Sequence, residues 1–205
     1  MRPKIVLWII LVFFSITSFV VPRPLDLGNK VQRWVISKSS SLSVNGSTNV
    51  NKFSCVIPNY DKVDTLSLST GKIGHGVDLS GSIGLSISAF DCHNSGMTKQ
   101  LQKTLDEKQF PLLRIKFLSL NQMPILTMKP EAITGEVEIE LAGVSKRFDV
   151  NYQITQNDQK SIHLLGTREI NFTDFNLVPP RKLGGMIQTK DQLNVDFTLI
   201  MKAMD

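Results

Sequence analysis

The side chains that most often carry catalysis or bind metal are few in this chain, and their spacing fits neither role. His75, His93 and His163 lie far apart, and no pair of them has the spacing of a His-x-x-x-His metal site. Cys92 adjoins His93, but the two would need distant ligands to complete a metal site. The chain has no Gly-x-Ser-x-Gly elbow, and Gly71-Lys72 lacks the glycine spacing of a phosphate loop. We therefore expect no enzymatic activity, no metal and no cofactor.

Arg168 occupies an unusual place for a charged residue. Counting back by twos from Ile170 and Phe172 puts it on the apolar side of a predicted strand. A buried guanidinium needs a partner, and a ligand phosphate or carboxylate would offer paired hydrogen bonds. Two alternatives remain: a structural carboxylate such as Asp174, or a β-bulge near Leu164-Leu165 that turns Arg168 outward.

The chain contains two cysteines, Cys55 and Cys92. In an exported protein they would meet an oxidising environment, and a pair of this kind is a candidate disulfide. The alternative is two buried thiols that pack as small apolar side chains.

Two alternating runs between Glu131 and Ile154 form the clearest structural element. Successive side chains of a strand point to opposite faces, so each run has one apolar and one polar face. The connection around Gly143 is short enough to make the two strands antiparallel neighbours. The apolar positions are Ile133, Val137, Ile139, Leu141, Phe148, Val150, Tyr152 and Ile154. Glu136, Glu138 and Glu140 lie on a polar face, which we expect to be wet.

Similar alternation recurs along most of the chain and is interrupted by one helical pattern. Met97, Leu101 and Leu105 recur at four-residue spacing, which predicts a helix ended by Phe110-Pro111. Residues 177–191 are expected to form a loop. Further strands are expected at 34–36, 42–46, 53–57, 66–68, 77–87, 112–120, 162–175 and 193–201.

This pattern predicts an all-β protein: an antiparallel β-barrel of about eight strands with one short helix alongside. A single sheet of that size must fold over or close, and closure removes its exposed edges. A sandwich of two sheets fits the alternation almost as well.

The N-terminus has the layout of a secretory signal. Arg2 and Lys4 precede an apolar run from Ile5 to Val21, and polar residues follow. We therefore expect a signal peptide at 1–21, a lead at 22–33 and the barrel at 34–205, with periplasmic or secreted localisation. Because no Ala-x-Ala site follows the run, an uncleaved membrane anchor is the alternative.

The charge of the chain excludes a nucleic-acid partner. The 23 basic and 18 acidic residues give a formal net charge of +5, and no basic stripe is interleaved with aromatic residues. Peripheral contact with anionic lipid stays open on charge alone, and the oligomeric state is not determined by the sequence.

In their order and spacing, several segments resemble the YceI-like family, bacterial exported proteins that bind polyisoprenoids and other long lipids. The resemblance spans roughly Trp34 to Met201 and implies a lipocalin-like barrel with a helix beside it. The chain departs from many members at Gly96–Leu101, in place of an Arg-Asp-x-His-Leu segment, and in its paired cysteines. The segments are Trp34–Ile36, Ser41–Gly46, Phe110-Pro111 with Ile115–Phe117, Ile133–Gly143 and Ile170–Leu177.

The resemblance also implies an apolar tunnel that holds one extended lipid or isoprenoid chain. Alternation alone favours a core filled by its own side chains, and the resemblance shifts the preference to a ligand. Val178–Met186 is then either a mobile flap over the tunnel entrance or an ordinary surface connection. The expected ligand-binding residues are Phe117, Val137, Ile139, Phe148, Val150, Leu164, Arg168, Ile170, Phe172, Phe197 and Leu199.

We therefore predict a non-catalytic lipid carrier or sequestering protein. One alternative is a structural or interaction domain with a filled barrel and no ligand. Another is an enzyme acting on lipids, for which the sequence offers no catalytic group.

Overall fold

The computed structural model describes residues 31–70 and 76–204, so the predicted signal peptide and His75 lie outside the described residues. The described chain forms eleven strands, one α-helix and three short 3₁₀ helices. The strands are β1 (Gln32–Ile36), β2 (Ser41–Thr48), β3 (Lys52–Ile57), β4 (Thr65–Thr70), β5 (Val77–Ser86), β6 (Leu112–Leu120), β7 (Glu131–Leu141), β8 (Val144–Gln156), β9 (Ser161–Asn171), β10 (Arg181–Lys182) and β11 (Ile187–Met204). The helices are α1 (Ser95–Thr104), η1 (Ile87–Ala89), η2 (Phe172–Phe175) and η3 (Leu183–Gly185).

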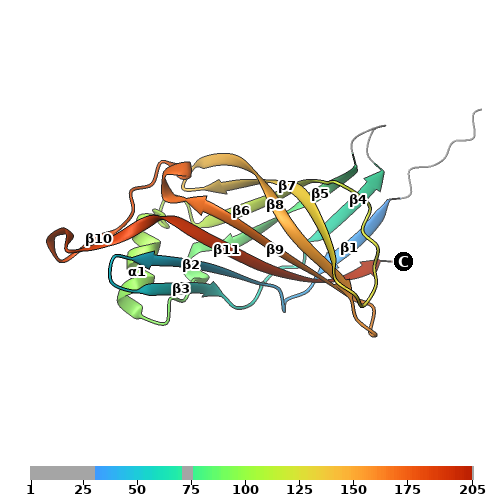
Figure 1. The fold of residues 1–205 in the computed structure, drawn as a ribbon, viewed down its shortest axis with the longest axis horizontal. Helices are drawn as coiled ribbons and strands as arrows, with labels where there is room; N and C mark the ends of the chain where they lie inside the picture. The colour runs from blue at the N-terminus through green and yellow to red at the C-terminus, as the bar shows by residue number, and fades with distance from the viewer. Residues whose placement is uncertain (1–30, 71–75, 205) are drawn as a thin grey trace, which may run out of the picture.

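Eight strands close into an antiparallel barrel (Figure 1). Their order is β1-β4-β5-β6-β7-β8-β9-β11, and β1 closes the ring by pairing with β4 on one side and β11 on the other. Closure pairs the backbone groups that an open sheet would leave at its edges. The prediction of an eight-stranded barrel with one helix is confirmed, and the sandwich alternative is wrong.

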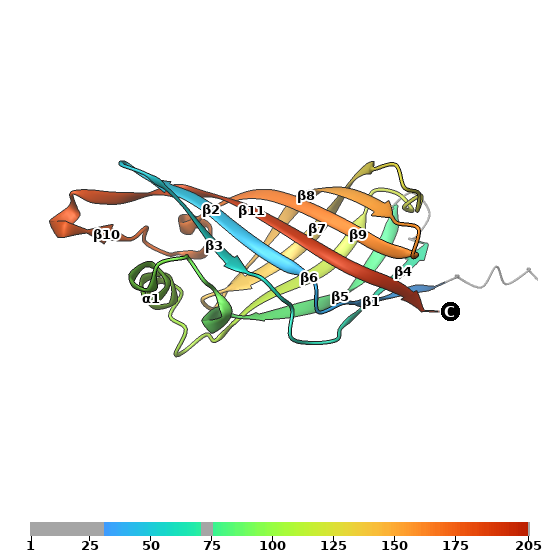
Figure 2. The same cartoon turned by 90° about the horizontal axis from the view of Figure 1, so that it is seen from below.

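The barrel closes in this way at one end only. β1 pairs with the last residues of β11, from Met201 to Met204, whereas β2 pairs with the earlier part of β11, from Thr189 to Thr198. The β2–β3 hairpin therefore takes the place of β1 beside β11 at the other end. There β3 pairs with β2 and makes one further bridge, from Val56 to Asp91. The helix α1 lies beside β3 at this end (Figure 2), which we call the helix end.

The helix α1 forms where the sequence predicts it. The Asn94 side chain caps its first turn by accepting a hydrogen bond from the Met97 amide at 3.0 Å. Met97 and Leu101 pack half-buried against the core, and Leu105, just past the last helical residue, is buried. None of the ten helical side chains is fully buried, so α1 is held to the barrel by one partly covered apolar face.

Aromatic side chains fill the middle of the barrel. The ring of Phe197 contacts Phe117 and Tyr152 edge to face, with centroid separations of 6.4 and 5.9 Å. Glycines make room for these rings, because a Cβ at Gly135 would collide with Tyr152 and one at Gly166 would collide with Phe197. Side chains around Trp34 fill the end away from α1, where Leu66, Ile154 and Met201 are fully buried. In the part of the barrel formed by residues 31–70 and 76–204, these side chains fill the middle and one end and leave no open tunnel through both.

Three predicted boundaries were wrong. The predicted strand 162–175 ends at Asn171, because Phe172–Phe175 coil into η2. Half of the predicted loop 177–191 is a hairpin, since Arg181 and Lys182 pair with Gln188 and Ile187, so the last strand begins at Ile187. These residues show no apolar alternation, which is why the pattern missed them. The first strand begins at Gln32, inside the predicted lead.

The hydroxyl of Tyr152 is buried and has no hydrogen-bond partner among the described residues. Burial also raises the pKa of Tyr152 above its ordinary range, so the side chain stays neutral. Removing an unsatisfied buried hydroxyl relieves its desolvation cost. We expect Tyr152→Phe to leave the free energy of unfolding in urea unchanged or to raise it by up to about 1–3 kcal/mol.

Tyr60→Phe is the matched control, because the Tyr60 hydroxyl donates a hydrogen bond to Asp64. That variant should lose about 1 kcal/mol. A loss of similar size in Tyr152→Phe would contradict the assignment of an unpartnered hydroxyl.

Candidate functional site

A cavity of about 60 Å³ lies inside the helix end of the barrel. Its surface is wholly apolar. Its lining comes from β2, β6, β7, β9, β11, η2 and α1 and from residues on either side of α1, and no charged residue contributes among the described residues. The lining residues are Leu42, Val44, Phe90, Leu101, Leu105, Leu113, Ile115, Ile139, Leu141, Ile170, Asn171, Phe172, Phe175, Leu177, Leu193 and Val195.

A larger groove of about 220 Å³ adjoins this cavity. It lies between the β2–β3 hairpin, α1 and the start of β11. Leu101 and Phe172 line both hollows, so these two side chains form the partition between them. The groove is lined by Thr48, Asn51, Phe53, Cys55, Asn94, Met97, Gln100, Leu101, Phe172, Pro180, Lys182, Ile187 and Thr189.

The two hollows differ in polarity. The groove combines apolar side chains such as Phe53 and Met97 with hydroxyl and amide groups such as those of Thr189 and Gln100. Of the described residues that line it, Lys182 is the one with a charged side chain. The pair of hollows therefore suits an amphipathic molecule with an apolar end inside and a polar end near a cation.

The size of the hollows limits what they can hold without rearrangement. Ligand pockets for small molecules usually measure about 300–1,000 Å³. Both hollows are smaller than this range. In this conformation they accommodate a short apolar segment, and a long chain requires displacement of a wall.

The segment Ile170–Leu177 shapes the floor of the cavity through a tightly capped turn. The Asn171 side chain and the Asp174 carboxylate form a capping box around η2, and the Asn171 amide donates to Asp174 at 2.8 Å. The Thr173 amide donates to Asp191 at 3.0 Å, which ties η2 to β11. These bonds direct Phe172 and Phe175 into the core.

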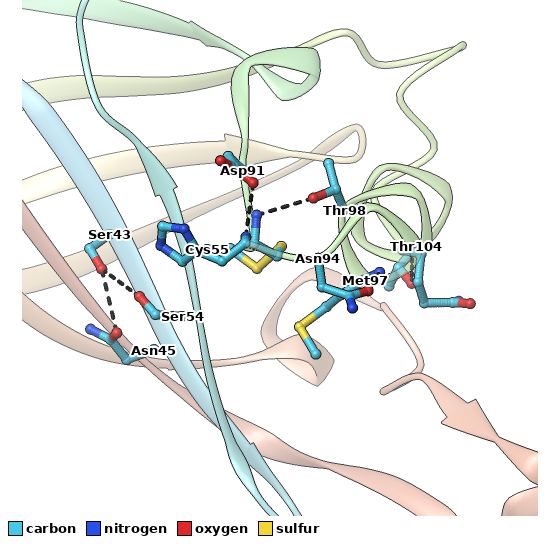
Figure 3. Close-up of a disulfide and its surroundings, with 12 residues drawn as sticks. Ser43, Asn45, Ser54, Cys55, Asp91, Asn94, Met97, Thr98 and Thr104 are labelled. Carbon is cyan, nitrogen blue, oxygen red and sulfur yellow. Dashed lines mark hydrogen bonds between the residues drawn. A yellow bond between two sulfur atoms is a disulfide. The ribbon is translucent and has the colours of Figure 1, made fainter.

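A disulfide between Cys55 and Cys92 joins β3 to the segment that precedes α1 (Figure 3). The predicted bond is confirmed. Val56 and Asp91 exchange two backbone hydrogen bonds of 2.8 Å beside it, and the Cys92 amide donates to Thr98 Oγ1 of α1 at 3.1 Å. The start of α1 is therefore fixed to β3. Cys92 cannot supply a thiolate for the metal site considered with His93.

The ten apolar residues predicted to bind a ligand are all buried, but only three of them line the cavity. Those three are Ile139, Ile170 and Phe172. The other seven belong to the core but do not line the cavity: Phe117, Val137, Phe148, Val150, Leu164, Phe197 and Leu199.

Alternation identified which residues face the interior but not where each of them lies along the barrel axis. The missed lining residues Ile115, Leu141 and Val195 belong to the same apolar faces as predicted ones. Their distance from the helix end depends on strand register. The pattern of one strand does not contain that information.

The inward position predicted for Arg168 was wrong. Its side chain is exposed, and its guanidinium carbon lies 5.6 Å from the centroid of the Phe148 ring. No bulge causes this, because β9 pairs with β11 in unbroken register. Instead, the β8–β9 ladder ends at Asn151 and Thr167, and the strands separate beyond it. Arg168 thus reaches solvent where a continuous sheet would have enclosed it.

Asp174, the structural partner considered for Arg168, accepts a hydrogen bond from Lys146 instead. The three predicted wet glutamates lie on the outer face, where Glu136 and Glu138 pair with Arg147, and Glu140 pairs with Arg114.

Among residues 31–70 and 76–204, no three metal-binding side chains of His, Cys, Asp or Glu gather at one point. In the same part of the chain, no helix has both the length and the apolar composition needed to cross a bilayer.

Asp174 gives the η2 turn a predictable dependence on pH. Burial raises its pKa, but hydrogen bonds from Lys146 and the Asn171 amide outweigh burial and leave the pKa lower than usual. A carboxyl group whose pKa is lower in the folded than in the unfolded protein stabilises the fold at pH values above its unfolded pKa. This stabilisation is lost as the pH falls through its folded pKa. We expect the deficit of Asp174→Asn in free energy of unfolding to be largest near neutral pH and to shrink below about pH 4.

Urea unfolding at several pH values measures this deficit. Lys146→Met removes one of the hydrogen bonds and should reduce the pH dependence of the wild-type protein. A deficit in Asp174→Asn that is constant from neutral to acid pH would contradict the assignment.

The disulfide closes a loop of 37 residues. The chain-entropy relation assigns such a loop about 4 kcal/mol of stabilisation. We expect the Cys55→Ser, Cys92→Ser double variant to lose about 3–4 kcal/mol in urea unfolding. Reduced wild-type protein should match the variant, and a loss below about 1 kcal/mol would contradict this role.

Comparisons with known proteins agree with this architecture. No protein-family model matches the sequence, and no curated protein matches it either. Among solved structures, the chain is similar to a polyisoprenoid-binding domain from Saccharophagus degradans implicated in plant cell wall breakdown. The TM-score is 0.61 and the sequence identity is 12%, and the match covers 83% of this chain and 98% of that one. It is also similar to BcnA from Burkholderia cenocepacia, with a TM-score of 0.57 and 14% identity over 78% of this chain and 95% of that one.

A third similar structure is a variant of a Campylobacter jejuni YceI protein, with a TM-score of 0.51 and 12% identity over 71% of this chain and 83% of that one. At these identities the likeness concerns the backbone. The chain has the fold of the YceI-like barrels.

Proposed function

We propose that this protein binds a lipid at the helix end of the barrel and carries or sequesters it without catalysis. The wholly apolar cavity, which adjoins a groove with one cation, is the observation that carries this proposal. The similarity to a domain described as polyisoprenoid-binding supports it. The ligand is a polyisoprenoid-like or fatty-acyl chain.

In this proposal the apolar end of the ligand occupies the cavity, and its polar end lies in the groove beside Lys182. This placement replaces the predicted anchoring role of Arg168, which lines neither hollow. The groove also offers the amide groups of Asn51 and Gln100 as hydrogen-bond partners.

Affinity requires more hydrocarbon than the cavity holds. A micromolar dissociation constant corresponds to about −8 kcal/mol, and each buried methylene contributes about 0.8 kcal/mol. About ten methylenes are needed even before the cost of ordering the chain. The ligand therefore continues from the cavity into the groove. The part of α1 beyond its start, which the disulfide fixes to β3, is the wall that moves, because none of the helical side chains is fully buried.

The protein acts outside the cytoplasm in this proposal, as a periplasmic or secreted protein. The positive, apolar and polar order of the first residues supports export. The disulfide supports an oxidising compartment.

Native mass spectrometry of protein purified from its own organism, followed by lipid extraction, tests the proposal. Wild-type protein should carry a bound lipid. Val195 lines the cavity from β11, and Val195→Phe should fill the space and abolish retention. Val63→Phe is the matched control, because Val63 is 67% exposed, and it should retain the lipid.

Urea unfolding shows whether each variant is folded, so that loss of the ligand is not mistaken for loss of the barrel. Wild-type protein that is folded and free of lipid would overturn the proposal. It would favour a structural or interaction domain, for which the filled half of the barrel already suffices.

A further inference from the structure

The hairpin formed by β10 and the start of β11 projects from the helix end of the barrel (Figures 1 and 2). We call Leu183–Met186 the hairpin tip. A Cβ added at Gly184 or Gly185 would meet no atom within 4 Å, so these two glycines lie in open space. The hairpin tip is the last part of the segment Val178–Met186 that the sequence offered as a flap.

The hairpin tip exposes large apolar side chains. Leu183 is 69% exposed and Met186 is 74% exposed. Three successive residues, Leu183, Gly184 and Gly185, have positive φ values of 50°, 64° and 97°. Such values are unusual for leucine and favoured by glycine. The turn therefore holds the Leu183 side chain in water at a cost in backbone strain.

The β2–β3 turn is attached to the same hairpin. The Asn49 side chain donates to the Met186 carbonyl at 2.9 Å and accepts from the Gln188 amide at 3.0 Å. Val50, the next residue, is 66% exposed. An apolar edge thus continues from the hairpin tip to the neighbouring turn.

The segments that line the groove beside this edge are rich in cationic residues. Three segments meet at the groove: 48–53, 94–104 and 177–190. Together they contain six cationic side chains and no carboxylate: Lys52, Lys99, Lys103, Arg181, Lys182 and Lys190. None of the ion pairs formed among residues 31–70 and 76–204 involves these six. Asp191 follows Lys190 directly, but its carboxylate accepts hydrogen bonds from Thr173. The three segments therefore carry a net positive charge that is complementary to an anionic surface.

A second loop also exposes large apolar side chains but has few cationic residues. Residues 121–130, between β6 and β7, expose Ile125 (64%) and Met128 (71%) at the opposite end of the barrel (Figure 1). That loop contains one lysine, and Glu131 at its end accepts a hydrogen bond from the Ile125 amide at 2.6 Å. It has the apolar side chains of the hairpin tip without the surrounding cations.

We propose that the hairpin tip inserts into the interface of an anionic lipid bilayer and docks the helix end of the barrel on it. Apolar side chains ringed by lysine and arginine are the composition that binds such interfaces. Docking does not depend on a bound ligand. If the proposed lipid-binding function also holds, docking brings the groove beside Lys182 to the membrane surface, where a lipid exchanges without crossing water.

Met186→Trp reports insertion at the hairpin tip directly. With phosphatidylcholine vesicles containing phosphatidylglycerol, its emission should shift to the blue and be quenched by lipids brominated on their acyl chains. Met128→Trp is the matched control and should show neither change. Trp8, Trp34 and residues 1–30 are common to both variants, so the difference between them belongs to the hairpin tip.

Vesicle cosedimentation measures the energetic contribution of the same groups. Each cation near an anionic membrane contributes about 1 kcal/mol, so Arg181→Gln with Lys190→Gln should weaken binding about 30-fold. Leu183→Ser with Met186→Ser should weaken it by at least about tenfold. Ile125→Ser with Met128→Ser should leave it unchanged, and neutral vesicles should bind more weakly.

Equal quenching at the hairpin tip and the control position would overturn the proposal. So would a blue shift of Met186→Trp that depends on protein concentration without vesicles, because it would assign the hairpin tip to contact with a second copy. Vesicle binding by protein that carries no lipid would support docking even if the proposed function fails.

Discussion

The mismatch in length between β11 and the strands beside it is the constraint on which the rest of the structure depends. β11 has 18 residues, whereas β1 has five and β2 has eight, so neither can cover it alone. β1 pairs with the end of β11, and β2 pairs with the earlier part of β11. The turn between β1 and β2 lies beside Ile200 of β11, whose amide donates to Ser40 Oγ at 3.0 Å. Because β3 then reaches no strand of the opposite wall, the helix end must be closed by side chains, a disulfide and α1 rather than by a ladder.

The two ends of the barrel therefore differ in role: one stabilises the fold, and the other offers space for a ligand. The closed end and the middle are filled by side chains around Trp34 and by the Phe117, Tyr152 and Phe197 rings, and that packing supports the barrel. The helix end keeps a cavity whose walls meet across elements of different kinds, among them η2 and the half-buried α1. A long apolar ligand would therefore be gripped at one end of the barrel rather than threaded through it. The groove and its cation lie where the ligand leaves the barrel.

Sequence reasoning predicted what depends on local periodicity and missed what depends on the register of distant strands. Alternation identified the barrel strands, four-residue spacing identified α1, and two cysteines identified the disulfide. The inward direction of Phe117 and Ile139 followed from the same alternation, but only Ile139 reaches the cavity. The inward prediction for Arg168 failed because β9 separates from β8 beyond Thr167, and the end of that pairing cannot be read from the alternation within one strand. Lys182 was missed as a groove residue because its strand is two residues long.

The most direct measurement of this account is a crystal structure of the protein purified with its own lipid. The account predicts continuous ligand density in the hollow bounded by Val195, Phe172 and Leu101, leaving past Lys182, with the Phe117, Tyr152 and Phe197 rings in their present contacts. Density that passes between those rings toward Trp34 would contradict it, because the middle of the barrel would then be a tunnel and not a filled core.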